Sequence, residues 1–202
     1  MSELNLERIK AAQKGDPVAI EEFIGKIRRP LFHYACNFLG NDFEAEDVTQ
    51  EVLIKIIRAL PGFKGDSTIW TWLFRIMTNA CIDYQRKVSA RPTSYLTRIN
   101  SEEEEAVTLE VRDTKRLPEE CYEQFELQET IRNALNRLSP EHRMIVILHD
   151  IHCFKYQEIA KITKIGLGTV KSRLFYARQE LRKVLSPLLQ EDKEVNDNAL
   201  SK

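Results

Sequence analysis

The stretch from Tyr156 to Lys183, YQEIAKITKIGLGTVKSRLFYARQELRK, predicts two short helices joined by a tight turn. The apolar residues of the first helix are Ile159, Ala160 and Ile162. The segment Ile165–Gly168 then interrupts the pattern with glycines, which accept turn conformations without a Cβ penalty. Beyond it, apolar residues return at helical spacing and predict a stripe that faces a core: Val170, Leu174, Ala177 and Leu181.

The opposite face of the second helix is basic and aromatic and can form hydrogen bonds; it carries Lys171, Ser172, Phe175, Tyr176 and Gln179. A helix with one buried stripe and one such face fits the major groove of DNA. The match is incomplete, because Lys164 stands where such turns usually have glycine. The alternative is an ordinary helical hairpin with a solvated basic face.

The composition is that of a globular protein with enough apolar residues for real cores, since 43% of the 202 residues are hydrophobic and 30% are charged. The sequence contains no run of eighteen apolar residues, so we expect no membrane insertion. The N-terminus, MSELNLERIKAAQKGD, has no apolar signal core, which predicts a chain that is not exported.

Four isolated cysteines suit a reducing cytoplasm, in which thiols are usually small buried apolar groups: Cys36, Cys81, Cys121 and Cys153. His149 and Cys153 are four residues apart, but two ligands do not make a metal site. We therefore expect a cytoplasmic protein with no metal and no cofactor.

The net charge of −1 hides an uneven distribution of charge. The segment Glu102–Glu129 contains eleven acidic and three basic residues, so the remainder of the chain has a net charge of +7. Two basic bodies joined by an acidic segment fit a partner that is nucleic acid, or a protein that handles it.

Nearly the whole chain has helical periodicity, which predicts an all-α fold of two helical domains joined by a flexible acidic linker. The expected N-terminal domain spans residues 1–88. The expected linker spans 89–122, in which a short helix around 102–110 is an alternative. The expected C-terminal domain, residues 123–190, is a four-helix domain that contains the helix-turn-helix, and 191–202 form a polar, frayed tail.

Capping residues and prolines predict where helices begin and end. Three polar residues are expected as N-caps: Asp16, Asn41 and Ser139. A break is expected near Arg29–Pro30, because proline disrupts a helix interior. The first helix of the C-terminal domain is expected to bury Leu127, Ile131, Leu135 and Leu138.

The helix from Glu44 to Leu60 has an unusual polar side. Its predicted buried stripe is Val48, Val52, Ile56 and Leu60. On the other side, the apolar Ile54 stands among Asp47, Gln50, Glu51 and Arg58. An exposed apolar residue with charged neighbours suggests a protein-binding patch, although a solvated face with one stray isoleucine is an equal alternative.

Residues 63–87, FKGDSTIWTWLFRIMTNACIDYQRK, combine a flexible, hydrogen-bonding loop with a helix. One stripe of that helix carries Trp72, Arg75, Asn79, Asp83 and Arg86. Aromatic rings can stack on unpaired bases while arginines and lysines follow phosphates. Simple core packing is the alternative for Trp70 and Trp72.

Three segments in this order resemble a bacterial extracytoplasmic-function (group IV) RNA polymerase sigma factor: DVTQEVLIKI from Asp47, the segment from Phe63, and LSPEHRMIVILHDIHCFKYQEIAKITKIGLGTVKSRLFYARQELRK from Leu138. The resemblance covers about residues 5–187. It implies a chain that is not an enzyme, that binds core RNA polymerase, and that directs promoter-specific transcription initiation. We also expect the chain to lack the extra N-terminal and central domains of primary sigma factors, which suits this compact group.

The resemblance also implies roles for residues. Docking on polymerase is implied for Asp47, Gln50, Glu51 and Ile54. Recognition and melting of the −10 element are implied for Lys64, Asp66, Ser67, Thr68, Trp72, Arg75, Asn79 and Arg86. Recognition of −35 duplex DNA is implied for Thr169, Lys171, Ser172, Arg173, Phe175, Tyr176 and Arg178. Tyr176 stands where relatives often have a basic residue, which puts the −35 sequence in doubt.

Two further implications concern partners. The family's linker threads the polymerase channel for RNA, and an acidic linker suits a channel built for phosphate, although it is otherwise a solvated spacer. An anti-sigma factor is a further expected partner. The alternatives are a stand-alone helix-turn-helix regulator and a helical adaptor that binds only protein.

Overall fold

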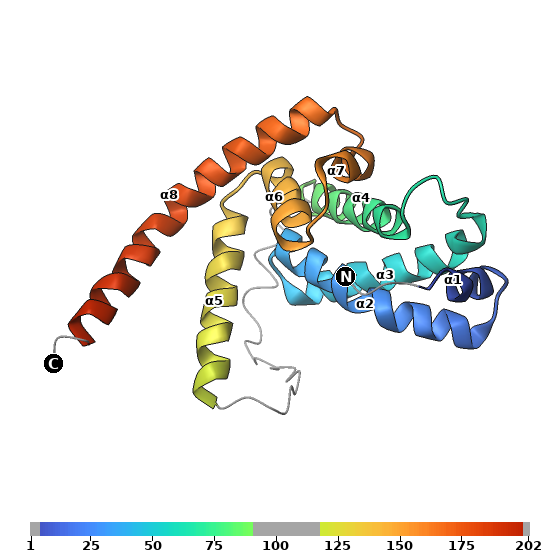
Figure 1. Cartoon of the computed structure of the whole chain (residues 1–202), viewed down its shortest axis with the longest axis horizontal. Coiled ribbons are helices and arrows are strands. Elements are labelled where there is room, and N and C mark those ends of the chain that lie inside the picture. The colour runs from blue at the N-terminus through green and yellow to red at the C-terminus, as the bar shows by residue number, and fades with distance from the viewer. Residues whose placement is uncertain (1–4, 91–117, 200–202) are drawn as a thin grey trace.

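The computed structural model describes residues 5–90 and 118–199, with side chains for 5–90 and 127–186. The described residues form helices and no strand, so the all-α prediction is confirmed (Figure 1). The N-terminal domain has four α-helices: α1 (Leu6–Gln13), α2 (Pro17–Leu39), α3 (Asp42–Ala59) and α4 (Ile69–Ser89). The C-terminal domain also has four: α5 (Pro118–Asn136), α6 (Pro140–Val146), α7 (Tyr156–Thr163) and α8 (Leu167–Ala199).

Local capping chemistry fixes the starts of the helices, as the sequence predicted. The side chain of Asp16 accepts a hydrogen bond from the backbone N–H of Val18 at 3.0 Å. Asn41 accepts from Phe43 at 2.9 Å at the start of α3. Thr68, which the sequence did not identify as a cap, accepts from the backbone N–H of Thr71 at 3.1 Å. Each bond satisfies a donor that has no partner inside the helix.

The predicted break near Arg29–Pro30 is wrong, because α2 continues through Pro30. Proline removes the hydrogen bond to the carbonyl of Lys26, but Lys26 is exposed, so water can hydrogen-bond that carbonyl. On either side of the proline, Ile27 and Leu31 are fully buried. Tertiary packing of these residues outweighs the local cost.

The core of the N-terminal domain lies among α2, α3 and α4. It is mainly aliphatic and aromatic, and the predicted stripe Val48, Val52, Ile56 and Leu60 is buried. One polar pair crosses it, since the hydroxyl of Thr78 donates to the hydroxyl of Tyr34 at 3.0 Å. This bond satisfies two buried hydroxyls and connects α4 to α2.

The turn between α7 and α8 supports the predicted helix-turn-helix. Lys164 adopts a left-handed conformation with φ of 56°, at the position where such turns usually have glycine. In α8, Val170, Leu174 and Ala177 are buried as predicted. Before α7, a π-helical turn at Ile147–Ile151 connects it to α6, and Ser139 caps α6.

Helix α5 differs from its prediction. Leu135 and Leu138 are buried, but Leu127 is 59% exposed and Ile131 is 39% exposed. Figure 1 shows the reason: α5 and α8 extend away from the other described helices, so none of these helices covers Leu127 and Ile131. Helix α5 begins at Pro118, inside the expected linker, and α8 continues to Ala199 through most of the expected tail. The acidic block and the alternative helix at 102–110 lie outside the described residues.

The two domains pack against each other. Helix α7 lies against α4, and α5 and α6 lie against α2 (Figure 1). Phe74 of α4 meets the rings of Phe154 and His152 edge-on, at centroid distances of 4.8 and 4.7 Å. The buried apolar residues therefore form one continuous cluster that runs through both domains.

Hydrogen bonds and an ion pair also connect the two domains. The guanidinium of Arg143 in α6 donates from Nη1 to the carbonyl oxygen of Phe38 in α2 at 2.6 Å. Its Nη2 donates to the carbonyls of Asn136 and Leu138 in its own domain at 2.9 and 3.2 Å. Arg132 of α5 forms an ion pair with Asp42 of α3 at 3.1 Å.

Burial of His152 at this boundary makes the folded state sensitive to acid. The side chain is 9% exposed, and its Nε2 has no hydrogen-bond partner among the described residues. Desolvation, followed by the positive charge of nearby His33, lowers the pKa of His152 from 6.5 to about 4. The folded state thus favours the neutral imidazole.

We expect acidification to destabilise the protein through His152. As the pH falls from 6.5 towards 4, the unfolded chain binds a proton that the folded chain does not, so the free energy of unfolding decreases. The contribution should be about 2 kcal/mol between pH 7 and pH 4.5. Urea unfolding at both pH values should give a smaller decrease for His152→Phe than for the parent. Equal decreases would contradict the assignment.

Candidate nucleic-acid and protein interfaces

The outer face of α8 is exposed over its first three turns. Lys171 and Ser172 are exposed, and Phe175 and Tyr176 are 66% and 55% exposed. The rings of Phe175 and Tyr176 meet edge-on at 5.5 Å. Large apolar rings held in water have no role in this domain's core, so this face is available to a partner.

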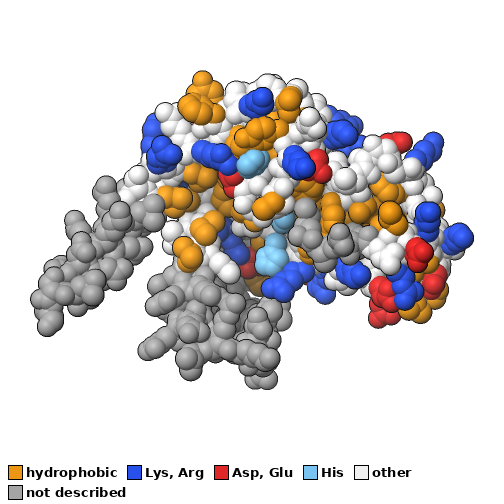
Figure 2. Space-filling model, in the orientation of Figure 1, with side chains coloured by type: hydrophobic (Ala, Val, Ile, Leu, Met, Phe, Trp, Pro, Cys, Tyr) orange, Lys and Arg blue, Asp and Glu red, His pale blue; other side chains and the backbone are white. Residues whose placement is uncertain are grey.

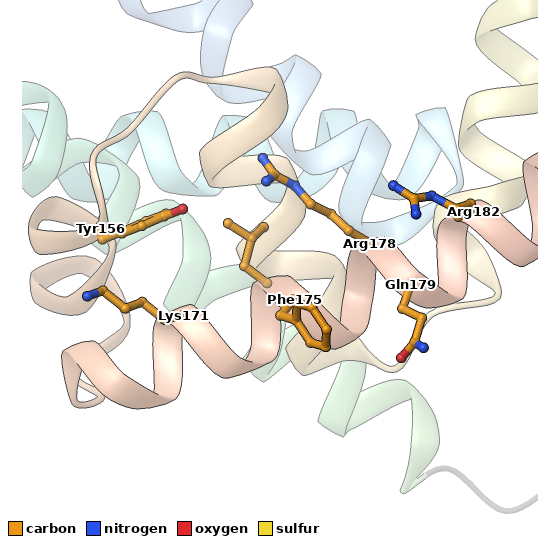
Figure 3. A pocket seen from close by; sticks show the side chains of 7 residues that line it. Tyr156, Lys171, Phe175, Arg178, Gln179 and Arg182 are labelled. Atoms are coloured by element: carbon orange, nitrogen blue, oxygen red, sulfur yellow. The ribbon is translucent and has the colours of Figure 1, made fainter.

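A groove with a volume of about 480 Å³ lies along this face, between α7 and α8. Its lining combines cationic, aromatic and amide side chains: Tyr156, Lys171, Leu174, Phe175, Arg178, Gln179 and Arg182. Figure 3 shows Lys171, Phe175 and Gln179 in a row along α8, with Tyr156 of α7 beside Lys171. The sequence did not predict Tyr156 as part of this site, because only the turn brings it next to α8.

Two of the arginines predicted to contact DNA are held by carboxylates within the domain. Arg178 makes a two-pronged ion pair with Asp150, through Nε at 3.1 Å and through a shorter contact from Nη2. Arg173 pairs with Glu141 at 2.5 Å. Both pairs connect α8 to residues 141–150, so they also orient the helix on its support.

Asp150 is adapted to this pairing. Partial burial alone would raise the pKa of its carboxyl, but hydrogen bonds from Arg178 and His149 outweigh burial and hold the pKa below its usual value. His149 Nδ1 lies 2.8 Å from Asp150 Oδ1. The carboxylate is thus charged at neutral pH and fixes the position of the guanidinium of Arg178.

The surface around the groove is mainly positive. Figure 2 shows Lys and Arg side chains interspersed with hydrophobic ones over α7 and the first half of α8, with little acidic surface between them. Thr169, at the start of this face, is exposed, and its carbonyl accepts a hydrogen bond from the hydroxyl of Ser172 at 3.1 Å. Such a mixture suits contacts to both phosphates and base edges.

A second candidate surface begins at the loop before α4. Lys64, Asp66 and Thr68 are exposed, whereas Ser67 is half-buried. The loop is anchored at its start, because the amide of Gln13 donates to the carbonyl of Phe63 at 2.8 Å. A loop fixed at both ends, by Gln13 and by the Thr68 cap, presents its central polar side chains in a defined place.

The surface continues along one face of α4. Trp72 and Arg75 are half-buried, and Asn79 and Arg86 are exposed, at a spacing that keeps all four on one side of the helix. The ring of Trp72 packs against Phe63 at a centroid distance of 5.2 Å. Trp70 instead lies near Phe74, whose own ring contacts Phe154 of the other domain. The two tryptophans therefore have different surroundings, and Trp72 belongs to the loop.

A third candidate surface lies on α3. Asp47, Gln50 and Glu51 are exposed and Ile54 is 51% exposed, so the predicted patch is on the surface. The structure adds Phe43, which is 71% exposed and one helical turn before Asp47. The sequence analysis missed Phe43, although its position four residues before Asp47 was the available signal.

The described residues offer little for other chemistry. No group of three potential ligands among them could hold a metal ion. His149 and Cys153 do not share a helix face, because Cys153 follows the π-helical turn with a φ of 59°. Within the described part of the chain, none of the helices has the length and apolar character needed to cross a membrane.

Comparison with known proteins identifies the family. Residues 23–91 match the model of sigma-70 region 2, and residues 128–181 match that of sigma-70 region 4. The ECF RNA polymerase sigma factor SigW of Bacillus subtilis is 32% identical over 183 residues, which cover 90% of this chain and 97% of SigW. The chain belongs to the extracytoplasmic-function RNA polymerase sigma factors. The RNA polymerase sigma-H factor of Pseudomonas aeruginosa is also similar, with 30% identity over 94% of this chain and 97% of its own length.

Solved structures agree with this family. The sigma factor RpoE of Bartonella quintana, in complex with the anti-sigma factor NepR, is 26% identical and has a TM-score of 0.61 over 82% of this chain and 96% of its own. CnrH, in complex with the cytosolic domain of CnrY, is 20% identical and has a TM-score of 0.62 over 89% of this chain and 96% of its own. This likeness supports the fold alone. The predicted sigma-factor family and two-domain helical fold are confirmed.

Proposed function

We propose that this sigma factor divides its work between its two domains. Residues 1–88 bind core RNA polymerase through α3 and take up the −10 element with the 63–68 loop and α4. Residues 123–190 bind −35 duplex DNA with the outer face of α8. The observation that carries this proposal is that all three surfaces are exposed on helices whose opposite faces are buried. A gel shift with and without core polymerase tests it, because a stand-alone regulator binds without polymerase.

Polymerase docking is proposed for the α3 surface, defined by Phe43, Asp47, Gln50, Glu51 and Ile54. Exposed apolar side chains ringed by polar ones are the usual anatomy of a protein interface, with the apolar groups at its centre. Phe43 and Ile54 are three turns of helix apart and would provide two such anchors. Neither side chain contributes to the core, so replacing them should leave the fold intact.

The α3 surface gives a direct prediction. Glu51→Lys combined with Ile54→Ala should weaken binding to core polymerase by about 2–4 kcal/mol, with unchanged helical content. Fluorescence anisotropy of labelled protein with core polymerase measures this affinity. Glu21→Lys, an exposed charge reversal on α2, serves as the control. Equal affinities for the control and the double variant would assign docking to another face.

Recognition of the −35 element is proposed for Thr169, Lys171, Ser172, Phe175 and Tyr176. Lys171 and Phe175 lie one turn apart in the groove, where an ammonium can reach a guanine edge and a ring can contact a thymine methyl. Arg173 and Arg178 are proposed for phosphates. Their ion pairs with Glu141 and Asp150 would be shared with, or exchanged for, the phosphate oxygens.

The α8 face predicts a split between base and phosphate contacts. Lys171→Ala and Phe175→Ala should each cost about 1–3 kcal/mol at the preferred −35 sequence and relax base preference. Arg178→Ala should weaken binding to all DNA sequences similarly and reduce the salt dependence of that binding. Holoenzyme binding to the preferred and scrambled −35 sites measures both effects. Lys183→Ala, exposed on α8 outside the groove, is the control. If all three variants lost the same affinity at the preferred and the scrambled sites, the assignment of base contacts to Lys171 and Phe175 would be refuted.

Strand opening is proposed for Lys64, Asp66, Ser67, Trp72, Arg75, Asn79 and Arg86, with Thr68 as the cap that supports the loop. The combination of an anchored polar loop, a half-exposed indole and cationic side chains suits unpaired DNA. A protein that binds only duplex DNA has no use for such a surface.

Asn79→Ala, or the pair Asp66→Gly and Ser67→Gly, should reduce open-complex formation about fivefold or more, which corresponds to the loss of about 1 kcal/mol. Thr68 is left intact so that α4 keeps its cap. Permanganate reactivity of thymines near the start site measures opening. A promoter with a pre-melted bubble should partly rescue the variants, and Gln85→Ala should behave as the parent. Undiminished opening of duplex promoters would assign melting elsewhere.

The remaining parts of the proposal concern context. The chain acts by binding and leaves catalysis to the polymerase, and it works in the cytoplasm, where that partner is. The acidic linker, which was predicted as residues 89–122 and meets α5 at Pro118, threads the polymerase channel for RNA. An anti-sigma factor is a further proposed partner, supported by the complex of the similar RpoE with NepR.

A further inference from the structure

Gln50 lies at the centre of the α3 surface. At about 100° per helical residue, it stands between Phe43 and Ile54 along the helix axis and within about 40° of both around it. All three side chains are exposed. A partner that packs on the two apolar side chains therefore also covers the amide of Gln50. A covered amide is costly unless its polar atoms keep hydrogen bonds.

One of these hydrogen bonds is already made within the protein. Nε2 of Gln50 donates to Oε1 of Glu46, one helical turn earlier, at 3.1 Å. The same Oε1 accepts a hydrogen bond from Nη2 of Arg28 in α2 at 2.7 Å. Because an ionised carboxylate can only accept, it is the nitrogen of the Gln50 amide that must face Glu46. The carbonyl oxygen, Oε1 of Gln50, is the arm of the amide that is left for a partner.

The surroundings of Glu46 suit this task. The hydrogen bond from Gln50 lowers the pKa of Glu46 most, burial opposes it, and the hydrogen bond and charge of Arg28 lower it further, so that the carboxyl is charged at neutral pH. The side chain of Glu46 is 31% exposed, and Arg28 reaches it from α2, which packs along α3. A surface ion pair of this kind adds little to the stability of the fold. Its geometry instead provides a fixed orientation for Gln50.

We propose that Arg28 and Glu46 are positioning residues for polymerase docking: Arg28 orients Glu46, and Glu46 turns the amide of Gln50 so that its carbonyl oxygen meets a hydrogen-bond donor of polymerase. The inference rests on the proposed function, because it takes the α3 surface as the docking site. An amide that is already oriented loses less conformational entropy on binding. It also keeps one N–H satisfied when water leaves the interface.

A double-mutant cycle tests whether Glu46 acts through Gln50. Gln50→Ala should weaken binding to core polymerase about fivefold and Glu46→Ala about threefold, whereas Glu46→Ala should cost nothing further in a chain that already has Gln50→Ala. Fluorescence anisotropy of the labelled full chain measures these affinities. Glu22→Ala, which removes the carboxylate of the exposed ion pair of Arg8 and Glu22, is the matched control and should bind as the parent. Equal losses from Glu46→Ala in both backgrounds would overturn the inference.

An exchange of the two side chains tests the orientation of the amide. Gln50→Glu alone should weaken binding, because two carboxylates one turn apart repel each other and lose their hydrogen bond. Gln50→Glu combined with Glu46→Gln restores that bond with donor and acceptor reversed, and it keeps the net charge and an oxygen that faces the partner. The exchanged chain should bind within about twofold of the parent. Binding no tighter than that of Gln50→Glu alone would overturn the proposed orientation.

The variant with Glu51→Lys and Ile54→Ala, measured alongside, separates this inference from the proposed function. If that variant binds polymerase as the parent does, docking is not on the α3 surface, and the proposed function fails together with the inference. If it binds weakly whereas Gln50→Ala and Glu46→Ala bind as the parent does, docking on α3 stands and only the positioning role is overturned. Arg28→Ala should weaken binding only in a chain that retains Glu46. A loss that persists beside Glu46→Ala would overturn the role of Arg28.

Discussion

The burial of one stripe along each long helix is the constraint on which the rest of the structure depends. In α8 this stripe is Val170, Leu174 and Ala177, and in α3 it is Val48, Val52 and Ile56. A helix that commits one face to the core leaves the opposite face to solvent, because both faces repeat with the same period. The positions of Lys171, Phe175 and Ile54 on the surface therefore follow from the packing of the buried residues on the opposite faces.

Supporting contacts then decide how rigidly each free face is held. The pair of Asp150 and Arg178 fixes α8 on the segment before it, and the Thr68 cap fixes the start of α4. The Thr68 cap joins residues three positions apart, and the pair of Asp150 and Arg178 joins charged groups with a defined geometry. They reduce the conformational entropy that a partner would otherwise have to overcome on binding.

Most of the local structure could be predicted from the sequence, because it depends on periodicity and capping. Asp16, Asn41 and Ser139 are caps, and the stripe of α8 is buried as expected. The failures have tertiary causes. Pro30 stays within α2 because buried neighbours on both sides outweigh a local signal, and Leu127 is exposed because none of the other helices that the structure describes covers it.

The candidate sites were predictable to the same extent. Residues on one helix, such as Lys171 and Phe175, share a face by spacing alone, and they line one groove. Tyr156 could not be found in this way, since it joins the groove only through the turn. The contact between the domains was equally invisible, because the donor and acceptor of its central hydrogen bond, Arg143 and Phe38, are 105 residues apart.

The acceptor in that bond is a main-chain carbonyl, and this has a consequence for comparing relatives. Every amino acid supplies the same carbonyl, so replacement of Phe38 by another residue leaves the hydrogen bond available. Covariation between paired positions, which is used to detect contacts, therefore has no signal to register here. Chimeras that exchange whole domains between relatives would keep this contact wherever the arginine and the end of α2 are preserved, even when the surrounding side chains differ.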